Sequence, residues 1–151
     1  MRVSHPPVPG EWLRQPALNI DLGRHNPALA SIHADDPGRL SAWIHSEIRN
    51  AGCAWAWGGY GEDRALYERS PGFGTGAQLR SVHLGIDLWL PAGTPVFAMA
   101  TGTVHSFADN AQPGDYGPTI ILEHPNEDGS SWFCLYGCLL YTSPSPRDLS
   151  T

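Results

Sequence analysis

The side chains of this sequence best suited to metal chemistry are His83 and Asp87. Between them the apolar residues Leu84 and Ile86 alternate with a glycine, Gly85. This period-two alternation predicts a β-strand over residues 81–89, with positions 83, 85 and 87 on one face. An imidazole and a carboxylate are ligands that Zn²⁺ accepts, and the glycine leaves room for an ion. Taken alone, the pair is better explained as a buried His–Asp contact or as two exposed polar residues on a sheet face.

The sequence that follows is typical of antiparallel β-structure. A proline- and glycine-rich turn is expected at 91–95, and a hairpin turn at 126–129. Strands are expected within residues 96–107, with an interruption at Gly102, and at 119–124 and 131–136. Such strands predict an antiparallel sheet or sandwich that positions the 81–89 segment.

The first eighty residues have a different pattern. Residues 1–34 are proline-rich and are expected to form an extended arm with a turn of helix. A helix is predicted over about 37–50, with Asp36 as its cap, apolar residues at helical spacing and Gly52 at its end. Residues 53–80 are glycine-rich and aromatic. They are expected to form a connector that covers the sheet, or a loop at a substrate groove with Glu62 and Arg64 as polar contacts.

Composition restricts the function. The chain has 151 residues, a net charge of −6 and no lysine, so a nucleic-acid partner is not expected. No apolar run has the length of a transmembrane segment, and no secretory signal follows Met1. The chain is therefore expected to be cytoplasmic or to have its true N-terminus elsewhere. The three cysteines do not suggest a disulfide framework.

From residue 81 onward the sequence contains an ordered series of motifs: His83-x-Gly85-x-Asp87, Pro91-Ala92-Gly93-Thr94-Pro95, Gly102-Thr103-Val104, Tyr116-Gly117, the run 120–124 and Leu135-Tyr136-Gly137. Through this series, residues 81–137 resemble the LytM/lysostaphin-type zinc metallopeptidases, which cut peptide cross-links in peptidoglycan. Upstream, Trp57-Gly58-Gly59-Tyr60 with Arg64 and Tyr67 looks like the leader of a subset of that family.

The resemblance implies a mainly β fold: the antiparallel sheet or sandwich of the LytM-type (duplicated hybrid motif) peptidase core, incomplete here. Its domain organisation would be an N-terminal extension at 1–80 that contains the helix, a partial peptidase core at 81–137 and a tail at 138–151. It also implies that His83 and Asp87 bind zinc. The partner would be a peptidoglycan peptide or another peptide substrate, and the family usually acts in the cell envelope or outside the cell.

The sequence departs from the family after Gly137. Cys138 stands where the family places a catalytic histidine, and no histidine follows His124, so the expected His-x-His pair with the third zinc ligand is missing. Residues 138–151 also resemble a translated adapter sequence, and we expect them to be a non-native tail. The alternative is a degenerate paralogue with a disordered Ser/Pro-rich end.

The remaining histidines are not expected to bind metal. His124 is predicted to be exposed or to lie behind the site, and His105 to be a structural polar group. Solvated side chains are expected for the histidines outside the matched region: His5, His25, His33 and His45.

Three other functions share part of this sequence pattern. A lipoyl or biotinyl carrier is excluded because it needs a lysine, and a sugar-phosphotransfer domain would not explain Asp87. The third is a catalytically inactive family member that binds cell wall or regulates a partner.

We expect the 151-residue chain to bind zinc weakly and to hydrolyse no peptide, because two protein ligands are fewer than the three of a catalytic zinc site. Metal analysis after dialysis, together with a peptide-cleavage assay, measures both properties. Stoichiometric zinc that survives dialysis, accompanied by cleavage, would contradict the expectation.

Overall fold

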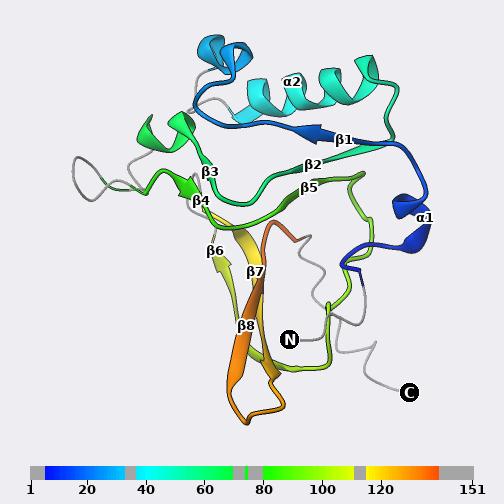
Figure 1. Cartoon of the computed structure of the whole chain (residues 1–151), viewed down its shortest axis with the longest axis vertical. Coiled ribbons are helices and arrows are strands. Elements are labelled where there is room, and N and C mark those ends of the chain that lie inside the picture. The colour runs from blue at the N-terminus through cyan, green and yellow to red at the C-terminus, as the bar shows by residue number, and fades with distance from the viewer. Residues whose placement is uncertain (1–5, 33–36, 70–73, 75–79, 111–114, 140–151) are drawn as a thin grey trace. The chain divides into compact units, whose positions relative to one another are not determined.

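The computed structural model describes residues 6–32, 37–69, 74, 80–110 and 115–139. The chain divides into two compact units: residues 8–94, and residues 95–151 together with 1–7. The fold is mainly β, as predicted, and the strands of the described residues form three sheets (Figure 1). The predicted boundary at residue 81 stays a prediction, and the predicted cap Asp36, His5, His33 and residues 140–151 lie outside the described part.

The 8–94 unit contains a three-stranded mixed sheet. Its strands are β1 (Ala17–Ile20), β2 (Trp55–Gly58) and β5 (Asp87–Trp89), in the order β1-β2-β5. β1 and β2 are parallel, and β2 and β5 are antiparallel. A parallel pair needs a long crossover connection. Here the crossover contains the 3₁₀ helix η1 (Pro27–Ser31) and the helix α2 (Pro37–Asn50), which runs alongside β1 (Figure 1).

Helix α2 confirms the helix predicted over 37–50. Gly52 ends it with a positive φ of 65°. The amide of Gly52 donates to the Arg49 carbonyl and that of Cys53 to the Ile48 carbonyl, each at 3.0 Å, which is the Schellman arrangement. Among the described residues, no helix combines the length and apolar character that crossing a membrane requires.

The core of this unit includes residues from the predicted N-terminal arm. Ile44 and Ile48, four residues apart on one face of α2, pack into a buried cluster completed by Ile20, Leu22, Leu29, Ile32 and Ala56. The prediction of an extended arm is therefore wrong for residues 17–32, which form β1, η1 and part of the core. The short apolar segments between the prolines have no periodic pattern that would predict a helix or a strand. They are part of the fold because they pack against the other residues of the buried cluster. A four-residue helix, α1 (Gly10–Leu13), precedes them.

The segment predicted as one strand at 81–89 is two strands in different sheets. β4 (Val82–His83) pairs with β3 (Glu62–Asp63) in a two-stranded sheet, whereas β5 belongs to the three-stranded sheet. The chain bends at Gly85 between them. The apolar members of the alternation do not face the core, because Val82, Leu84 and Ile86 are 50%, 71% and 63% exposed. The short 3₁₀ helix η2 (Ala65–Arg69) follows β3.

The other unit contains an antiparallel meander. Its strands are β6 (Thr103–Asn110), β7 (Gly117–Pro125) and β8 (Ser131–Tyr136). The predicted strands at 119–124 and 131–136 are confirmed, but the strand predicted from residue 96 begins only at Thr103. The predicted hairpin turn is present: the Asn126 amide donates to the Ser130 carbonyl at 2.7 Å, and Gly129 has a φ of 83°. The turn at 91–95 is also present, with the Thr94 amide donating to the Pro91 carbonyl at 3.1 Å.

We expect Ile44→Ala to lower the free energy of unfolding by about 2–5 kcal/mol, because it leaves a cavity among buried side chains. The neighbouring exposed residue provides the control, since His45→Ala removes no buried contact and is expected to change stability by less than about 0.5 kcal/mol. Urea denaturation followed by circular dichroism measures both. Equal stabilities for the two variants would contradict the core described above.

Candidate metal site

His83 presents one ring nitrogen to a potential ligand. Its carbonyl accepts a hydrogen bond from the Gly61 amide at 2.7 Å, and its ring lies edge-on to Tyr67 with centroids 6.3 Å apart. The side chain is 16% exposed, and Nδ1 is buried without a hydrogen-bond partner among the described residues. The other nitrogen, Nε2, lies 3.7 Å from Asp87 Oδ1. Nε2 is therefore the atom through which His83 would bind a cation.

The bend at Gly85 brings His83 and Asp87 together. A continuous strand would separate their Cα atoms by about 13 Å, since each residue adds about 3.3 Å. A Cβ on residue 85 would lie 2.9 Å from His83 Nε2, closer than real Cβ contacts. Glycine thus leaves the imidazole in place, which is a more specific role than the open space expected from the sequence.

Arg64 is the strongest polar partner of Asp87. Its Nη2 lies 2.7 Å from Asp87 Oδ2 and 2.7 Å from Glu62 Oε2, and its Nε donates to the same Glu62 oxygen at 3.0 Å. Nη1 donates to the Tyr67 hydroxyl at 3.2 Å. Arg64 is only 4% exposed, so this buried cation is held by two carboxylates and a phenol. Of the two alternatives for residues 53–80, these contacts fit the connector better than the substrate loop.

The surroundings of Arg64 keep it charged. Burial alone would lower its pKa, but the Coulombic attraction of Asp87 and the hydrogen bonds to Glu62 and Asp87 outweigh burial and raise the pKa above its ordinary value. The group thus acts as a permanent cation beside the carboxylate of the pair.

Strand β3 is also held on its other side. Glu62 Oε1 accepts from the Leu22 amide at 3.3 Å. Arg24 bridges Asp63 at 2.8 Å and Glu68 at 2.6 Å, and its amide donates to the Asp63 carbonyl at 2.7 Å. These contacts fix the strand that pairs with β4 and so help to fix His83.

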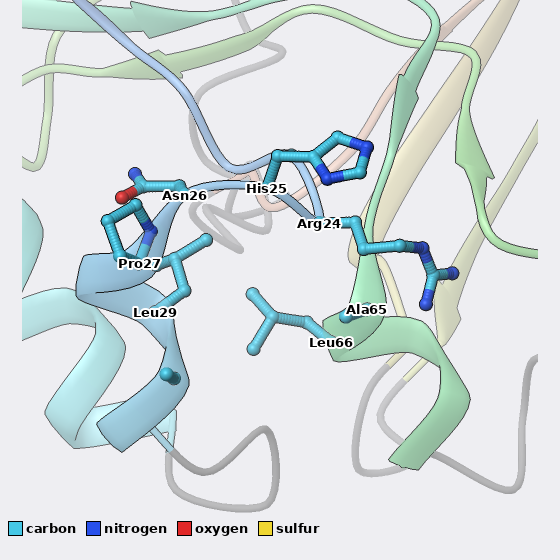
Figure 2. Close-up of a pocket in the computed structure, with 9 residues that line it drawn as sticks. Arg24, His25, Asn26, Pro27, Leu29, Ala65 and Leu66 are labelled. Atoms are coloured by element: carbon cyan, nitrogen blue, oxygen red, sulfur yellow. The ribbon is translucent and has the colours of Figure 1, made fainter.

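A cavity of about 240 Å³ lies beside Arg24, and Leu29 and Leu66 point toward each other across it (Figure 2). Its lining does not include His83 or Asp87; the residues that line it are Gly23, Arg24, His25, Asn26, Pro27, Leu29, Ala30, Ala65 and Leu66. The charge of Arg24 is already paired with two carboxylates. The cavity is thus separate from the candidate metal site.

His124 is buried, which excludes the first of its two predicted alternatives, an exposed side chain. It is 0% exposed, stacks on Trp132 with ring centroids 4.1 Å apart, and places Nδ1 3.0 Å from the Thr101 carbonyl oxygen. Because a carbonyl only accepts, Nδ1 is assigned the proton. The strand pattern placed this residue correctly on β7 but gave no sign of the stacking partner. His25, His45 and His105 are exposed, as expected for His25 and His45.

Cys138 lies in the other unit from His83 and Asp87. It is exposed, has a φ of 55°, and its amide donates to the Tyr116 carbonyl at 2.6 Å. All three cysteines are described, and none of them forms a disulfide. Within the described ranges, no group of three or more His, Cys, Asp or Glu side chains is arranged to hold a metal. Of the predicted metal-binding residues, the structure brings His83 and Asp87 together as a pair.

Sequence reasoning did not find the role of Arg64. The only indication in the sequence that Arg64 has a role was its place, with Tyr67, in the leader motif. It gave no indication that the guanidinium reaches a carboxylate more than twenty positions away.

Comparison with known proteins gives one match. Residues 81–143 match the model of the family described as peptidase family M23, a family of metallopeptidases. No curated protein and no solved structure matches the chain. The matched segment contains both His83 and Asp87.

We expect the carboxyl group of Asp63 to titrate with a pKa of about 2, lowered from 3.8 by the hydrogen bonds from Arg24 and Ser81. Since the folded-state pKa is depressed, its contribution to stability is complete above about pH 4 and is lost as the pH falls through about 2. Carboxyl NMR during acid titration measures the midpoint. Arg24→Met should return it toward 3.8, and Arg49→Met, on the exposed end of α2, should leave it unchanged. A wild-type midpoint near 3.8 would contradict the ion pair.

Proposed function

Because residues 81–143 match the model of peptidase family M23, we propose that this chain carries zinc-binding residues of an endopeptidase that acts on the peptide cross-links of peptidoglycan. The observation that carries the proposal is the pair of donor atoms, His83 Nε2 and Asp87 Oδ1, which lie 3.7 Å apart inside the matched segment.

The spacing of these atoms suits zinc. With zinc–ligand bonds of about 2.0–2.2 Å and tetrahedral angles, two ligand atoms lie about 3.3–3.6 Å apart. The observed 3.7 Å needs only a small adjustment. The pair accounts for two of the three protein ligands that a catalytic zinc site uses. When bound, zinc supplies Lewis acidity toward the oxygen of a peptide carbonyl.

The chain's own residues have distinct tasks in this proposal. His83 offers the lone pair of Nε2, since its Nδ1 is buried. Asp87 offers Oδ1 as an anionic ligand, because Arg64 occupies Oδ2. Gly85 leaves the space in which the two side chains converge.

A second candidate function is a binding module of the same family without catalysis. It is favoured by Cys138, which stands where the resemblance places a catalytic histidine. Such a module would bind peptidoglycan or a partner enzyme through its surface and would not need His83.

We expect His83→Ala to weaken zinc binding at least tenfold, because it removes one of the two converging donors. Isothermal titration of the full chain with zinc chloride measures the affinity. His45→Ala is the matched control, since His45 is an exposed histidine of the same unit that lies outside the pair. Equal affinities for wild type and His83→Ala would contradict the zinc site.

The same variants separate the two candidates. Sedimentation with insoluble peptidoglycan, with and without a chelator, measures binding to the cell wall. If recognition depends on the metal, both His83→Ala and chelation release the chain. If the chain is a metal-independent binding module, neither does so.

A further inference from the structure

We propose that Arg64 is a positioning residue of the metal site: it joins the two sheets that carry the two donors and holds the Asp87 carboxylate with one oxygen toward His83. This inference rests on the zinc site proposed above.

The topology creates the need for such a residue. His83 lies on β4 in the two-stranded sheet, and Asp87 begins β5 in the three-stranded sheet. Among the described strands, no ladder of backbone hydrogen bonds joins β4 to β5. The chain between them consists of three residues with a bend at Gly85. Backbone pairing therefore does not fix the distance between the donors.

Arg64 provides the missing connection. It directly follows β3, where Glu62 is the register partner of His83. From that position its Nη2 reaches Asp87 Oδ2 on the other sheet at 2.7 Å. One buried side chain thus holds the strand of one donor against the carboxylate of the other.

The contact also orients the carboxylate. The terminal torsion of an aspartate is broad, so the plane of its carboxylate can turn at little cost. Arg64 takes Oδ2 at 2.7 Å and leaves Oδ1 toward His83 Nε2 at 3.7 Å. Asp87 is thereby presented as a ligand with one oxygen available.

The charge of Arg64 is balanced where it lies. A lone cation beside the site would repel a metal ion, but Glu62 accepts from both Nη2 and Nε of Arg64, at 2.7 and 3.0 Å. Formally, the two carboxylates and one guanidinium leave one negative charge. The cluster therefore orients Asp87 without cancelling its attraction for a cation.

Strand β2 leaves room for Trp89 beside this contact. Gly58 is the register partner of Asp87. A Cβ at this position would lie 2.9 Å from the ring of Trp89, closer than real Cβ contacts, but at an ordinary 3.4 Å from Arg64 Nη2. The glycine thus accommodates the Trp89 ring next to the place where Arg64 meets Asp87.

The opposite role makes the opposite prediction. If Arg64 were a resident cation that a metal must displace, removing it would strengthen metal binding. If it positions Asp87, removing it weakens metal binding, by about 10–100-fold as is typical when a partner of a metal ligand is lost.

The test is zinc titration of the full chain carrying Arg64→Met or Arg64→Lys, with the cobalt absorption spectrum as a second readout. We expect Arg64→Met to lose about 10–100-fold in zinc affinity and to change the cobalt spectrum. Arg64→Lys should recover only part of the loss, since a lysine lacks the planar fork that engages both carboxylates. Arg49→Met is the control: it also removes an arginine, but from the exposed end of α2, and it should change zinc affinity by less than twofold.

Each other outcome is decisive. Unchanged or tighter zinc binding by Arg64→Met, while His83→Ala still loses zinc, overturns the positioning role and leaves the zinc site intact. Zinc binding by the wild type that does not depend on His83 overturns the proposed function and this inference with it.

The wild-type protein provides a measurement that does not depend on whether the variants fold. The guanidinium N–H signals of Arg64 should stay protected from solvent exchange when zinc saturates the site. Loss of that protection on zinc binding would mean that the metal displaces Arg64 and would overturn the proposal.

Discussion

The buried guanidinium of Arg64 is the interaction on which the site depends. It is 4% exposed and pairs with two carboxylates. One belongs to Glu62 on the adjacent strand β3, and the other to Asp87 on β5 of another sheet. A buried charge is tolerated only when it is paired and hydrogen-bonded. The carboxylates therefore stabilise the buried cation, and the cation in turn links the two sheets.

Two glycines leave room for the side chains around this arrangement. Gly85 lies where a Cβ would meet His83, and Gly58 where a Cβ would meet the ring of Trp89. Both glycines belong to motifs that were visible in the sequence. Their function becomes clear only when the distances to side chains on other strands are known.

The sequence predicted the elements whose signals are local. Helix α2 has apolar residues at helical spacing, and β7, β8 and the turn between them follow alternation and turn chemistry. Elements that depend on distant partners were not predicted. The parallel pairing of β1 with β2 and the burial of His124 under Trp132 leave no local pattern. The break of the 81–89 segment into two strands was hidden by an alternation whose apolar residues are exposed.

The residues of the candidate site likewise differ in whether the sequence predicts them. Their residue types and spacing predicted His83 and Asp87, although the single strand predicted to carry both residues is wrong. The contact of Arg64 with Asp87 joins residues separated by the whole η2 segment and by β4. No local sequence pattern predicts this contact, so it is recognised only in the folded structure.

The most direct test of this account is the ¹⁵N spectrum of the His83 ring during titration with zinc. Since Nδ1 is buried and Nε2 faces Asp87, zinc should shift the Nε2 signal as a directly bound nitrogen and leave Nδ1 protonated. A zinc-induced shift at Nδ1 alone, or no shift at either nitrogen at saturating zinc, would contradict the claim that His83 and Asp87 form a metal-binding pair.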